Sequence, residues 1–568
     1  MVLSKIWSQG QIFAFSALDG RSLHTDDFVG TLCGDRLGII FYSKTKRELC
    51  FKYYSKDFKE FFAVTSDYIE VINKDDSRIK IVYANTHLII GRFTSCCKPI
   101  VMVEGKHNYI IKDGVEIHDT FDGQFTGIKI VDNMFCFAFS DNVDDLIKTV
   151  NCGFDLEVDS EIAKKCELYK TFSLKESNEF APLYAKCLST MKTQLYTPES
   201  MFTKTWSTPD RLPHKFLWLW DSVFHGIGHS NYNSKIGEEL ILSLFDTQRE
   251  DGFIPHLSTP KWQSDITQPP IIAWGANIVY QRSENKEFLK VVYQGNKKFL
   301  KWCQANRRDT DEELYTWLTG DDENCRCDES GMDNSPRFDK HTRLQAIDYS
   351  CFMANDVRNM ANIAQELGLY DEADEYKNWY ERIKKEINRK LWDKDDGFYY
   401  DYDLPNNTLH KVSSVASFLP LFAGVCDDRQ AGILVEHLLN PDEYFTEFPI
   451  PSISKKDATF GSDMWRGPVW INYNYMISKG LFEYNFKQLS DYIIDKTISV
   501  LNEWYFKRGV MFEFYDSENK KAPCELNRKG PPVEPYNFEI RMQSIRDYGW
   551  SNTLLFDLLH NKYFADNQ

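Results

Sequence analysis

The fold class of the larger part of this chain can be read from residues 351–392, CFMANDVRNMANIAQELGLYDEADEYKNWYERIKKEINRKLW. Apolar side chains recur in it at helical intervals, as in Ile383, Ile387 and Leu391, and mark one face of a helix. Gly368 interrupts the pattern, and glycine often follows the end of a helix because it adopts left-handed backbone without steric cost. The stretch therefore predicts two helices joined at Gly368.

Similar helical patterns continue on both sides of this stretch, from about residue 160 to Leu559. Residues 286–304 are one further example, and residues 235–256 are another, which ends at the turn pair Asp251-Gly252. Long connectors that carry Trp and Pro separate these patterns. Stacked helical hairpins that close into a ring fit the length, although periodicity alone does not distinguish a ring from an open bundle.

The first 150 residues have a different period. Short runs rich in Val, Ile, Phe and Tyr, such as residues 67–73 and 78–84, are divided by turns and show no helical pattern between them. Many short strands in succession predict an antiparallel β-sandwich. We therefore expect an α+β multidomain chain, with a β-sandwich domain over residues 1–155, a linker over 156–180 and a helical domain over 181–568.

Composition excludes several classes of function. The chain has 568 residues and a net charge of −17, which argues against nucleic acid and anionic membranes as partners. It has no run of ~18 apolar residues and no signal-like N-terminus, so we expect a cytoplasmic protein. Its 14 cysteines are too sparse for a disulfide scaffold, and no spacing matches a metal motif, so no cofactor or metal is expected. The oligomeric state stays open.

The connectors hold the residues that suggest chemistry. Aromatic rings pack against the C–H faces of sugars, while carboxylate, amide and guanidinium groups hydrogen-bond the hydroxyls. Taken singly, each Trp is equally compatible with plain core packing, but here each adjoins a charged or amide group in a loop broken by Pro or Gly. The predicted pocket for a small carbohydrate contains Trp220, Asp221, Gln268, Gly331, Trp465 and Arg466.

Two carboxylates in connectors are candidates for catalysis. Cleavage of a glycosidic bond needs one carboxyl group to donate a proton and a second to activate water or attack directly. Asp333, in the turn DESGMDNSPRFD at 328–339, and Glu513, in GVMFEFYDSE at 509–518, are these candidates. An Asp in such a turn is more often a turn former or helix cap than an acid. Glu534 and Glu539 are the nearest rivals of Glu513.

The motifs ESGMDNSPRFD, LWLWDSVFH, TQPP, WRGPVW and FEFYD…YGWSN together resemble glycoside hydrolase family 63, the processing α-glucosidases and mannosylglycerate-hydrolase-like enzymes. They resemble the trehalases of family 37 more distantly. The resemblance implies an (α/α)6 toroid and an inverting mechanism, with Asp333 as general acid and Glu513 as general base. It also implies that Trp220 and Asp221 hold the sugar in the cleaved position. Gln268 matches the Gln of the QPP motif, and Gly331 is expected to line the pocket beside the acid. Arg466 is then expected to contact the sugar or orient the base; otherwise it forms a buried ion pair.

The sequence favours an inverting, exo-acting α-glycosidase, with an α-glucosidase as the first choice. A disaccharide phosphorylase on a similar toroid is one alternative, and a sugar isomerase that uses His225 and His229 is another. A glycan-binding protein without activity is the third, although both carboxylates are present. One departure from the family pattern lies just before the acid, where LTGDDENCRCDESG, residues 318–331, is unusually acidic and rich in Cys. This departure leaves the specificity of the site open.

Overall fold

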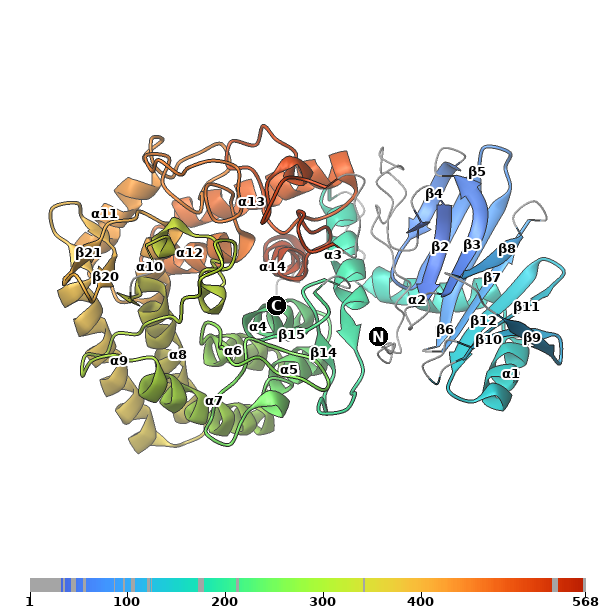
Figure 1. Cartoon of the computed structure of the whole chain (residues 1–568), viewed down its shortest axis with the longest axis horizontal. Helices are drawn as coiled ribbons and strands as arrows, with labels where there is room; N and C mark the ends of the chain where they lie inside the picture. Colours follow the sequence, from blue (N-terminus) through green and yellow to red (C-terminus); the bar gives the residue numbers. More distant parts are fainter. Residues whose placement is uncertain are drawn as a thin grey trace.

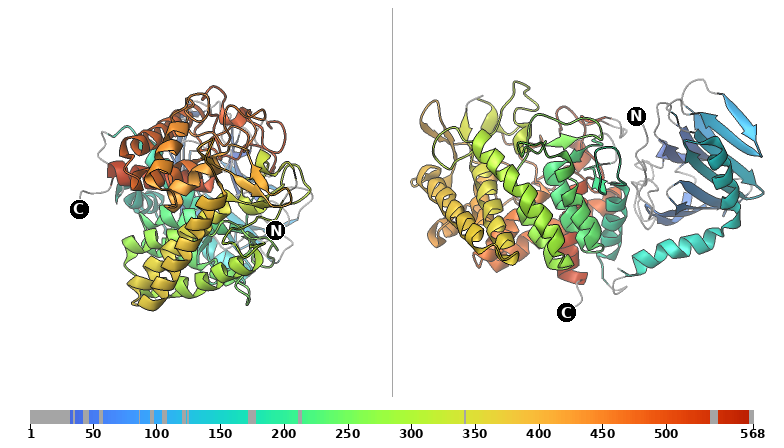
Figure 2. Two further views of the ribbon diagram at one scale, coloured as in Figure 1. Left: turned by 90° about the vertical axis from the view of Figure 1, so that its left-hand side faces the viewer. Right: turned by 90° about the horizontal axis from the view of Figure 1, so that it is seen from below.

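Two antiparallel sheets lie at one end of the molecule and a large group of helices at the other (Figure 1). In the computed structural model the chain passes from the strands into the helices through α2, Val158–Thr171, which runs between the two parts in the view from below (Figure 2). The structure describes residues 32–33, 36–41, 47–54, 58–85, 87–94, 98–103, 108–119, 123, 125–171, 178–210, 214–340, 343–533 and 540–564.

The strands of the N-terminal part form two antiparallel sheets. The larger sheet has the order β4-β5-β6-β7-β12-β11-β10-β9, and the smaller has the order β1-β2-β3-β8. The strands are β1 (Leu32–Cys33), β2 (Arg36–Phe41), β3 (Arg47–Tyr54), β4 (Phe58–Val64), β5 (Tyr68–Asn73), β6 (Arg78–Asn85), β7 (Leu88–Phe93), β8 (Pro99–Val103), β9 (Tyr109–Lys112), β10 (Val115–Asp119), β11 (Phe125–Val131) and β12 (Met134–Ser140).

Both faces of the larger sheet are buried at its centre. Val82, Ile90 and Cys136 on one face pack with α1, Val143–Cys152, and with α2. Neighbouring residues of the same strands, which point to the other face, are also buried. The region expected to be all β therefore includes a helix, and the expected linker at 156–180 contains α2. Helix α1 was not predicted, whereas α2 begins near residue 160, where the sequence was expected to change to a helical period.

The even-numbered helices from α4 to α14 form a closed ring. Each contacts the next in the series, and α14 contacts α4, so the series has no open end. α4 and α14 are buried along their whole length, as expected for helices surrounded by others. The ring consists of α4 (Leu219–Ser230), α6 (Ile272–Ser283), α8 (Ile347–Glu366), α10 (Leu419–Ala423), α12 (Ile471–Glu483) and α14 (Gly549–Leu559).

The odd-numbered helices lie outside this ring (Figure 1). Helix α9 shows the difference, because only one stripe of it, including Trp379, Ile383 and Ile387, is buried. It is joined to α8 through Gly368, which has φ of +77°, so the helix pair predicted from residues 351–392 is present. These helices are α3 (Ala181–Thr193), α5 (Ser234–Leu242), α7 (Lys286–Asn306), α9 (Tyr370–Lys390), α11 (Asp428–Leu438) and α13 (Lys487–Arg508).

Short strands stabilise the connectors between the helices. They pair within connectors or between neighbouring ones, which gives these long loops fixed positions. The strands are β13 (Leu195–Tyr196), β14 (Trp206–Ser207), β15 (Leu217–Trp218), β16 (Leu257–Ser258), β17 (Leu344–Gln345), β18 (Trp392–Asp393), β19 (Phe398–Tyr399), β20 (Asp401–Asp403) and β21 (Thr408–His410).

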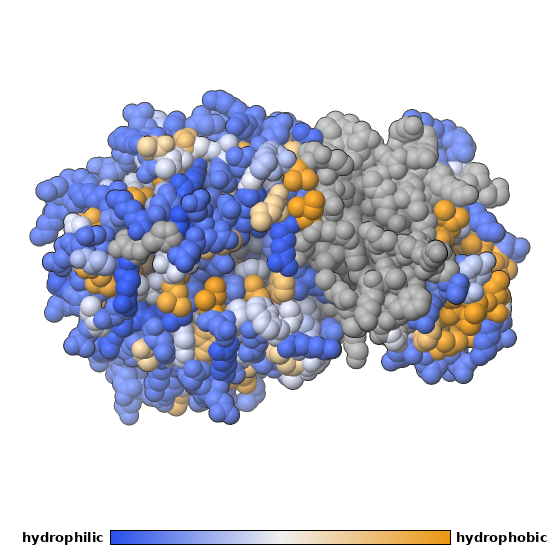
Figure 3. Space-filling model, viewed as in Figure 1, coloured by the Kyte–Doolittle hydropathy of each residue, from blue (hydrophilic) through white to orange (hydrophobic). Residues whose placement is uncertain are grey.

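The surface of the helical part is mainly hydrophilic in the view of Figure 3, with small apolar patches between charged groups. Exposed apolar side chains also lie on β9, where Tyr109, Ile110 and Ile111 are all more than half exposed. None of the helices in the described part of the chain combines the length and apolar character that crossing a membrane requires.

Candidate active site

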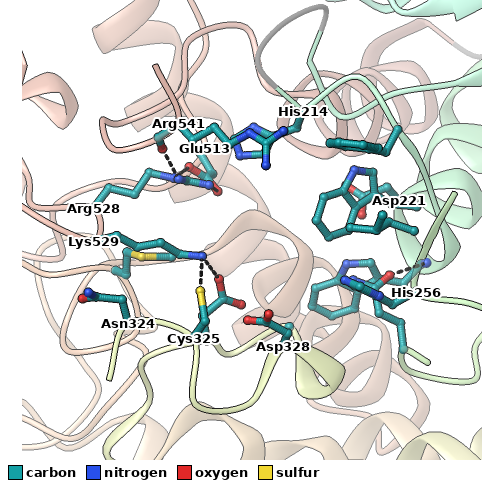
Figure 4. A pocket seen from close by; sticks show the side chains of 18 of the residues that line it. His214, Asp221, His256, Asn324, Cys325, Asp328, Glu513, Arg528, Lys529 and Arg541 are labelled. Atoms are coloured by element: carbon teal, nitrogen blue, oxygen red, sulfur yellow. Dashed lines mark hydrogen bonds and ion pairs between the residues drawn. The ribbon is translucent and has the colours of Figure 1, made fainter. Parts of the chain in front are cut away.

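A cavity of about 430 Å³ lies among the connectors that precede the N-termini of the ring helices. Five of the six residues predicted to bind sugar line it, together with both candidate carboxylates. In Figure 4, Arg528 and Lys529 lie on one side of the cavity and Asp221 and His256 on the other. The predicted residues that line it are Trp220, Asp221, Gln268, Gly331, Asp333, Trp465 and Glu513.

Two charged residues that do not line the cavity, Glu329 and Arg337, fix the turn at 328–339. The buried carboxylate of Glu329 accepts hydrogen bonds from Arg307, with Nη2 at 2.7 Å, and from the backbone N–H of Thr267 at 3.1 Å. The buried Arg337 guanidinium forms ion pairs with Asp348 at 2.6 Å and Asp401 at 2.8 Å. Glu329 and Arg337 therefore position the backbone that carries Asp333.

Gly331 is required in this turn for two reasons. It follows the short 3₁₀ helix Asp328–Ser330 and has φ of +70°, a conformation that favours glycine. A Cβ atom on it would also lie 2.4 Å from Cζ2 of Trp220. The absence of a side chain therefore lets the turn lie directly against the indole of Trp220, two residues before Asp333.

The carboxylate of Asp333 forms an ion pair with a lysine. Nζ of Lys529 lies 2.8 Å from Oδ2 of Asp333, and the same ammonium donates to Sγ of Cys325 at 2.7 Å. Asp328 is the third acidic or thiol group here, because its ligand atom, Sγ of Cys325 and a carboxylate oxygen of Asp333 all lie within 4.8 Å of one another. Such a group of donors can hold a cation, and the cation that contacts it in this structure is Lys529.

Electrostatics differ between the members of this cluster. Burial, followed by the charge of Asp333, raises the pKa of Asp328 to about 7. Burial alone would lower the pKa of Lys529, but the charge of Asp333, its hydrogen bond to Lys529 and the nearby Cys325 together raise that pKa. Lys529 is therefore charged across the physiological range, whereas Asp328 gains a proton near neutral pH.

Glu513 is held more tightly than Asp333. Its side chain is 3% exposed and pairs with Arg528 through two hydrogen bonds, Nε to Oε2 at 2.5 Å and Nη2 to Oε1 at 3.1 Å. A bidentate guanidinium–carboxylate pair fixes both the position and the orientation of the carboxylate. The backbone N–H of Glu513 donates to the carbonyl of Ile545 at 3.1 Å, which ties the residue to the connector before α14.

The opposite side of the cavity carries Asp221 and Gln268. Asp221 is 2% exposed, and burial, together with the charge of Glu513, raises its pKa well above the usual range. Its Oδ1 has no hydrogen-bond partner among the described residues. Oε1 of Gln268 accepts a hydrogen bond from the backbone N–H of Trp220 at 3.3 Å. This side therefore presents an unpaired polar atom next to an indole ring.

Stacked aromatic rings form the rest of the wall. Trp465 and Trp470 are parallel, with ring centroids 3.8 Å apart, and Trp220 meets Trp550 edge to face at 5.3 Å. The indole N–H groups of Trp465 and Trp550 have no partner among the described residues. Rigid aromatic faces with few polar groups are typical of a sugar site.

Arg466 is not among the residues that line the cavity. Its guanidinium instead pairs with Asp339 at 2.6 Å, and the side chains are 21% and 40% exposed. The arginine that contacts Glu513 is Arg528, not Arg466. Arg466 does form an ion pair, but this pair is partly exposed rather than buried. The left-handed φ of +132° at Gly467 turns the chain directly after Arg466.

The sequence also offered two groups of alternative catalytic residues, and the structure describes only one of these groups. Glu534 and Glu539, the rivals of Glu513, lie outside the described residues. His225 and His229, which an isomerase would use, are buried in α4 and do not line the cavity. Burial lowers the pKa of His225 to about 3, so its ring is neutral and tied to Ser207 by a hydrogen bond at 2.8 Å.

The sequence interpretation missed both cations next to the carboxylates. Arg528 and Lys529 stand in the segment LNRKGPP, 15 and 16 residues after Glu513, where two adjacent basic residues were the only signal. Cys325 and Asp328 were noted only as part of an unusual segment. His256 was also missed; it lines the cavity, and burial lowers its pKa to about 4.

Comparisons with known proteins identify a family. The model of the mannosylglycerate hydrolase MGH1-like glycoside hydrolase domain matches residues 214–551. A mannosylglycerate hydrolase of Thermus thermophilus is 24% identical over 388 residues, which are 53% of this chain and 89% of that protein. The matched residues span the connectors that line the cavity.

Solved structures show the same fold. The structure of the GH63 mannosylglycerate hydrolase from a second strain of Thermus thermophilus, in complex with glucose, aligns with a TM-score of 0.54 at 22% identity, over 66% of this chain and 99% of that one. A bacterial glucoamylase complexed with acarbose aligns with a TM-score of 0.58 at 10% identity, over 99% of both chains. The second likeness extends over the N-terminal sheets as well as the helices.

Proposed function

Because the chain belongs to the mannosylglycerate hydrolase MGH1-like glycoside hydrolase domain family, we propose that it is an inverting, exo-acting α-glycosidase. The match covers more than half of the chain, and it confirms the resemblance to family 63 predicted from the motifs. The chain is thus a glycoside hydrolase, and the proposal concerns its stereochemistry, its substrate and the residues that act.

The proposed fold of the helical part is an (α/α)6 toroid preceded by a β-sandwich, with the domain limits 1–155, 156–180 and 181–568. The closed series of contacts from α4 to α14 supports the toroid. The two antiparallel sheets and the likeness to glucoamylase over the whole chain support the sandwich.

One observation carries the mechanism: Asp333 and Glu513 line the same cavity although they come from distant connectors. In the proposed reaction Asp333 protonates the glycosidic oxygen, and Glu513 removes a proton from the water that attacks the anomeric carbon. Arg528 holds the Glu513 carboxylate in place through an ion pair and two hydrogen bonds, so a base at this position has a fixed orientation. The two carboxyl groups should lie roughly 6.5–9.5 Å apart to leave room for that water.

The sugar of the cleaved bond is proposed to lie against Trp220, with Asp221 and Gln268 binding its hydroxyls. Oδ1 of Asp221 has no hydrogen-bond partner among the described residues, so it is available to a sugar hydroxyl, and burial raises the pKa of this group. At about 430 Å³, the cavity is near the lower end of the ~300–1,000 Å³ range of ligand sites, which suits a short substrate.

An α-glucoside is the first choice of substrate, and an α-mannoside is the second. The glucose complex of the Thermus thermophilus relative and the acarbose complex of the glucoamylase support the first. The activity in the names of the relatives, hydrolysis of mannosylglycerate, supports the second. Small α-linked disaccharides and sugar conjugates are both within the proposed range.

The test is a screen of 4-nitrophenyl α-D-glucoside, 4-nitrophenyl α-D-mannoside, α-linked glucose disaccharides and α-mannosylglycerate, each with and without inorganic phosphate. We expect hydrolysis of at least one substrate without phosphate, and loss of it in both Asp333→Asn and Glu513→Gln for substrates with poor leaving groups. Turnover that requires phosphate would instead identify a phosphorylase. Binding of a sugar without any turnover would identify a glycan-binding protein.

A further inference from the structure

Two large apolar side chains at the cavity are exposed to solvent. Trp262 is 56% exposed and Met542 is 50% exposed, and both belong to the lining of the cavity. An indole left in water gives up the free energy that burial of its apolar surface would provide. Two such side chains at the same cavity therefore indicate a ligand that covers them.

The backbone that carries Trp262 is fixed by a tight turn. Oγ1 of Thr259 accepts hydrogen bonds from the N–H groups of Trp262 at 2.8 Å and Lys261 at 3.2 Å. The backbone N–H of Thr259 donates to the carbonyl of Trp262 at 2.7 Å, and a β-bridge between Ser258 and Gln263 closes the turn. A platform on such a turn loses little conformational freedom when a ligand stacks on it.

The wall that ends in Trp262 extends from the bottom of the cavity to its mouth. Asp221 and His256 line the cavity and are buried, whereas Trp262, on the hairpin that His256 begins, is more than half exposed. Leu257 of β16 pairs with Trp218 of β15, which ties this hairpin to the segment directly before Asp221. A sugar held at Asp221 therefore has its outer neighbour on the side of Trp262.

The proposed acid lies near the same hairpin. Burial lowers the pKa of His256 to about 4, and the charge of Asp333 partly opposes this effect. Asp333 is also the more exposed of the two candidate carboxylates, at 20% against 3% for Glu513. Because the acid protonates the oxygen of the leaving group, the leaving group belongs on the acid side of the cavity, toward the mouth.

We propose that Trp262, with Met542 beside the same cavity, is the platform for the leaving group, and that this group is a ring with an apolar face, such as a second pyranose. The inference rests on the proposed glycosidase activity and deepens it by naming the class of leaving group. The C–H face of a pyranose covers an indole, whereas a short acyclic acid such as glycerate offers no such face.

The charges at the cavity agree with a neutral leaving group. In the described part of the chain, five carboxyl groups and three guanidinium or ammonium groups line the cavity. Two of these three cations are already paired with the carboxylates proposed to be catalytic. The third, Arg541, has its guanidinium carbon 5.2 Å from the ring centroid of Phe216. A neutral ring therefore fits this lining better than an anion does.

The experiment measures kcat and KM on three substrates with the same sugar on the cleaved side: an α-linked disaccharide, the methyl α-glycoside and the glycerate conjugate. For the disaccharide, Trp262→Ala should lower kcat/KM by about fivefold to tenfold, mainly through a higher KM, because stacking is present before and during the reaction. The other two substrates should change by less than about twofold, since neither leaving group has a ring.

Two further variants show whether the aromatic face is responsible. Trp262→Phe keeps such a face and should recover most of the activity on the disaccharide. Phe482→Ala is the matched control, because Phe482 is 54% exposed on α12 and does not line the cavity. It should leave the kinetics on all three substrates unchanged.

The inference is overturned if Trp262→Ala loses the same activity on the disaccharide and on the methyl glycoside, because a structural role would affect every substrate alike. An unchanged KM for the disaccharide, or a loss confined to the glycerate conjugate, would overturn it as well. Failure of the proposed function has a different result: the wild type would then hydrolyse none of the glycosides, and the inference would fall with it.

Discussion

Glu513 and Asp333 line one cavity, but the protein holds them in different ways. Glu513 is 3% exposed and has a bidentate guanidinium partner, whereas Asp333 is 20% exposed and has a single ammonium contact. The first arrangement fixes a charge in place at low solvent exposure. The second keeps a carboxylate near solvent, where it can exchange a proton.

This difference matches the two roles in an inverting reaction. A base must stay ionised and precisely aimed at water, while an acid must be reprotonated after every turnover. The turn that carries Asp333 shows the same difference. Ion pairs of Glu329 and Arg337 fix this turn, and Asp333 itself is not needed as an anchor. Changes on the two sides should therefore have different consequences.

The largest effect is expected from Glu513→Gln. It removes the base and leaves Arg528 buried without a counter-charge, so kcat should fall by at least about 10³-fold on substrates with good and poor leaving groups alike. Steady-state kinetics on both nitrophenyl and methyl glycosides measures this. Glu447→Gln, at an exposed residue paired with Lys496, should have no such effect. A loss confined to poor leaving groups would mean that Glu513 acts as an acid.

A loss of stability should follow Arg337→Met on the acid side. The change removes the cation between Asp348 and Asp401, and breaking a buried ion pair in this way costs about 3–5 kcal/mol in the free energy of unfolding. A lower urea midpoint in tryptophan fluorescence would show it. Arg358→Met, which breaks a more exposed pair with Glu483, should cost less than about 1 kcal/mol. Equal losses in both variants would contradict the assigned anchor.

Asp333→Asn should reduce kcat/KM by about 10²-fold on methyl glycosides and by much less on nitrophenyl glycosides. The amide keeps the shape of the side chain but has no proton of suitable acidity to donate. Asp339→Asn is the control, because Asp339 lies in the same turn but outside the cavity, paired with Arg466. An equal loss on both kinds of substrate would argue against an acid.

The smallest effect is expected from Arg466→Ala. The half-exposed pair with Asp339 contributes at most about 1 kcal/mol, so kcat/KM should change by less than about fivefold. A large increase in KM would instead support the sugar contact that the WRGPVW motif led us to expect. Kinetics on the best substrate of the screen decides this.

Much of the fold follows from the period of the sequence. The helix pair around Gly368 was predictable because its apolar stripe and its glycine agree. Closure of the ring was not, because it depends on contacts such as that between α14 and α4, which are far apart in the chain. The helical period that starts near residue 160 indicates a helix where α2 lies, although this segment was expected to be a linker.

The candidate site was predictable where a motif carries the residue. Asp333 and Glu513 stand in recognisable motifs, and the structure places both on the cavity. Arg528 and Lys529 could not be assigned partners from sequence, since a pair of basic residues before a glycine is common on protein surfaces. Only the folded chain shows that they meet the two carboxylates.

The configuration of the sugar first released tests the central claim most directly. Proton NMR of the reaction on an α-glycoside, recorded within the first turnovers and before mutarotation, distinguishes the two anomers. With Glu513 activating water across the cavity from Asp333, the β-anomer should appear first. First release of the α-anomer would show retention of configuration and would contradict the assignment of Glu513 as a base.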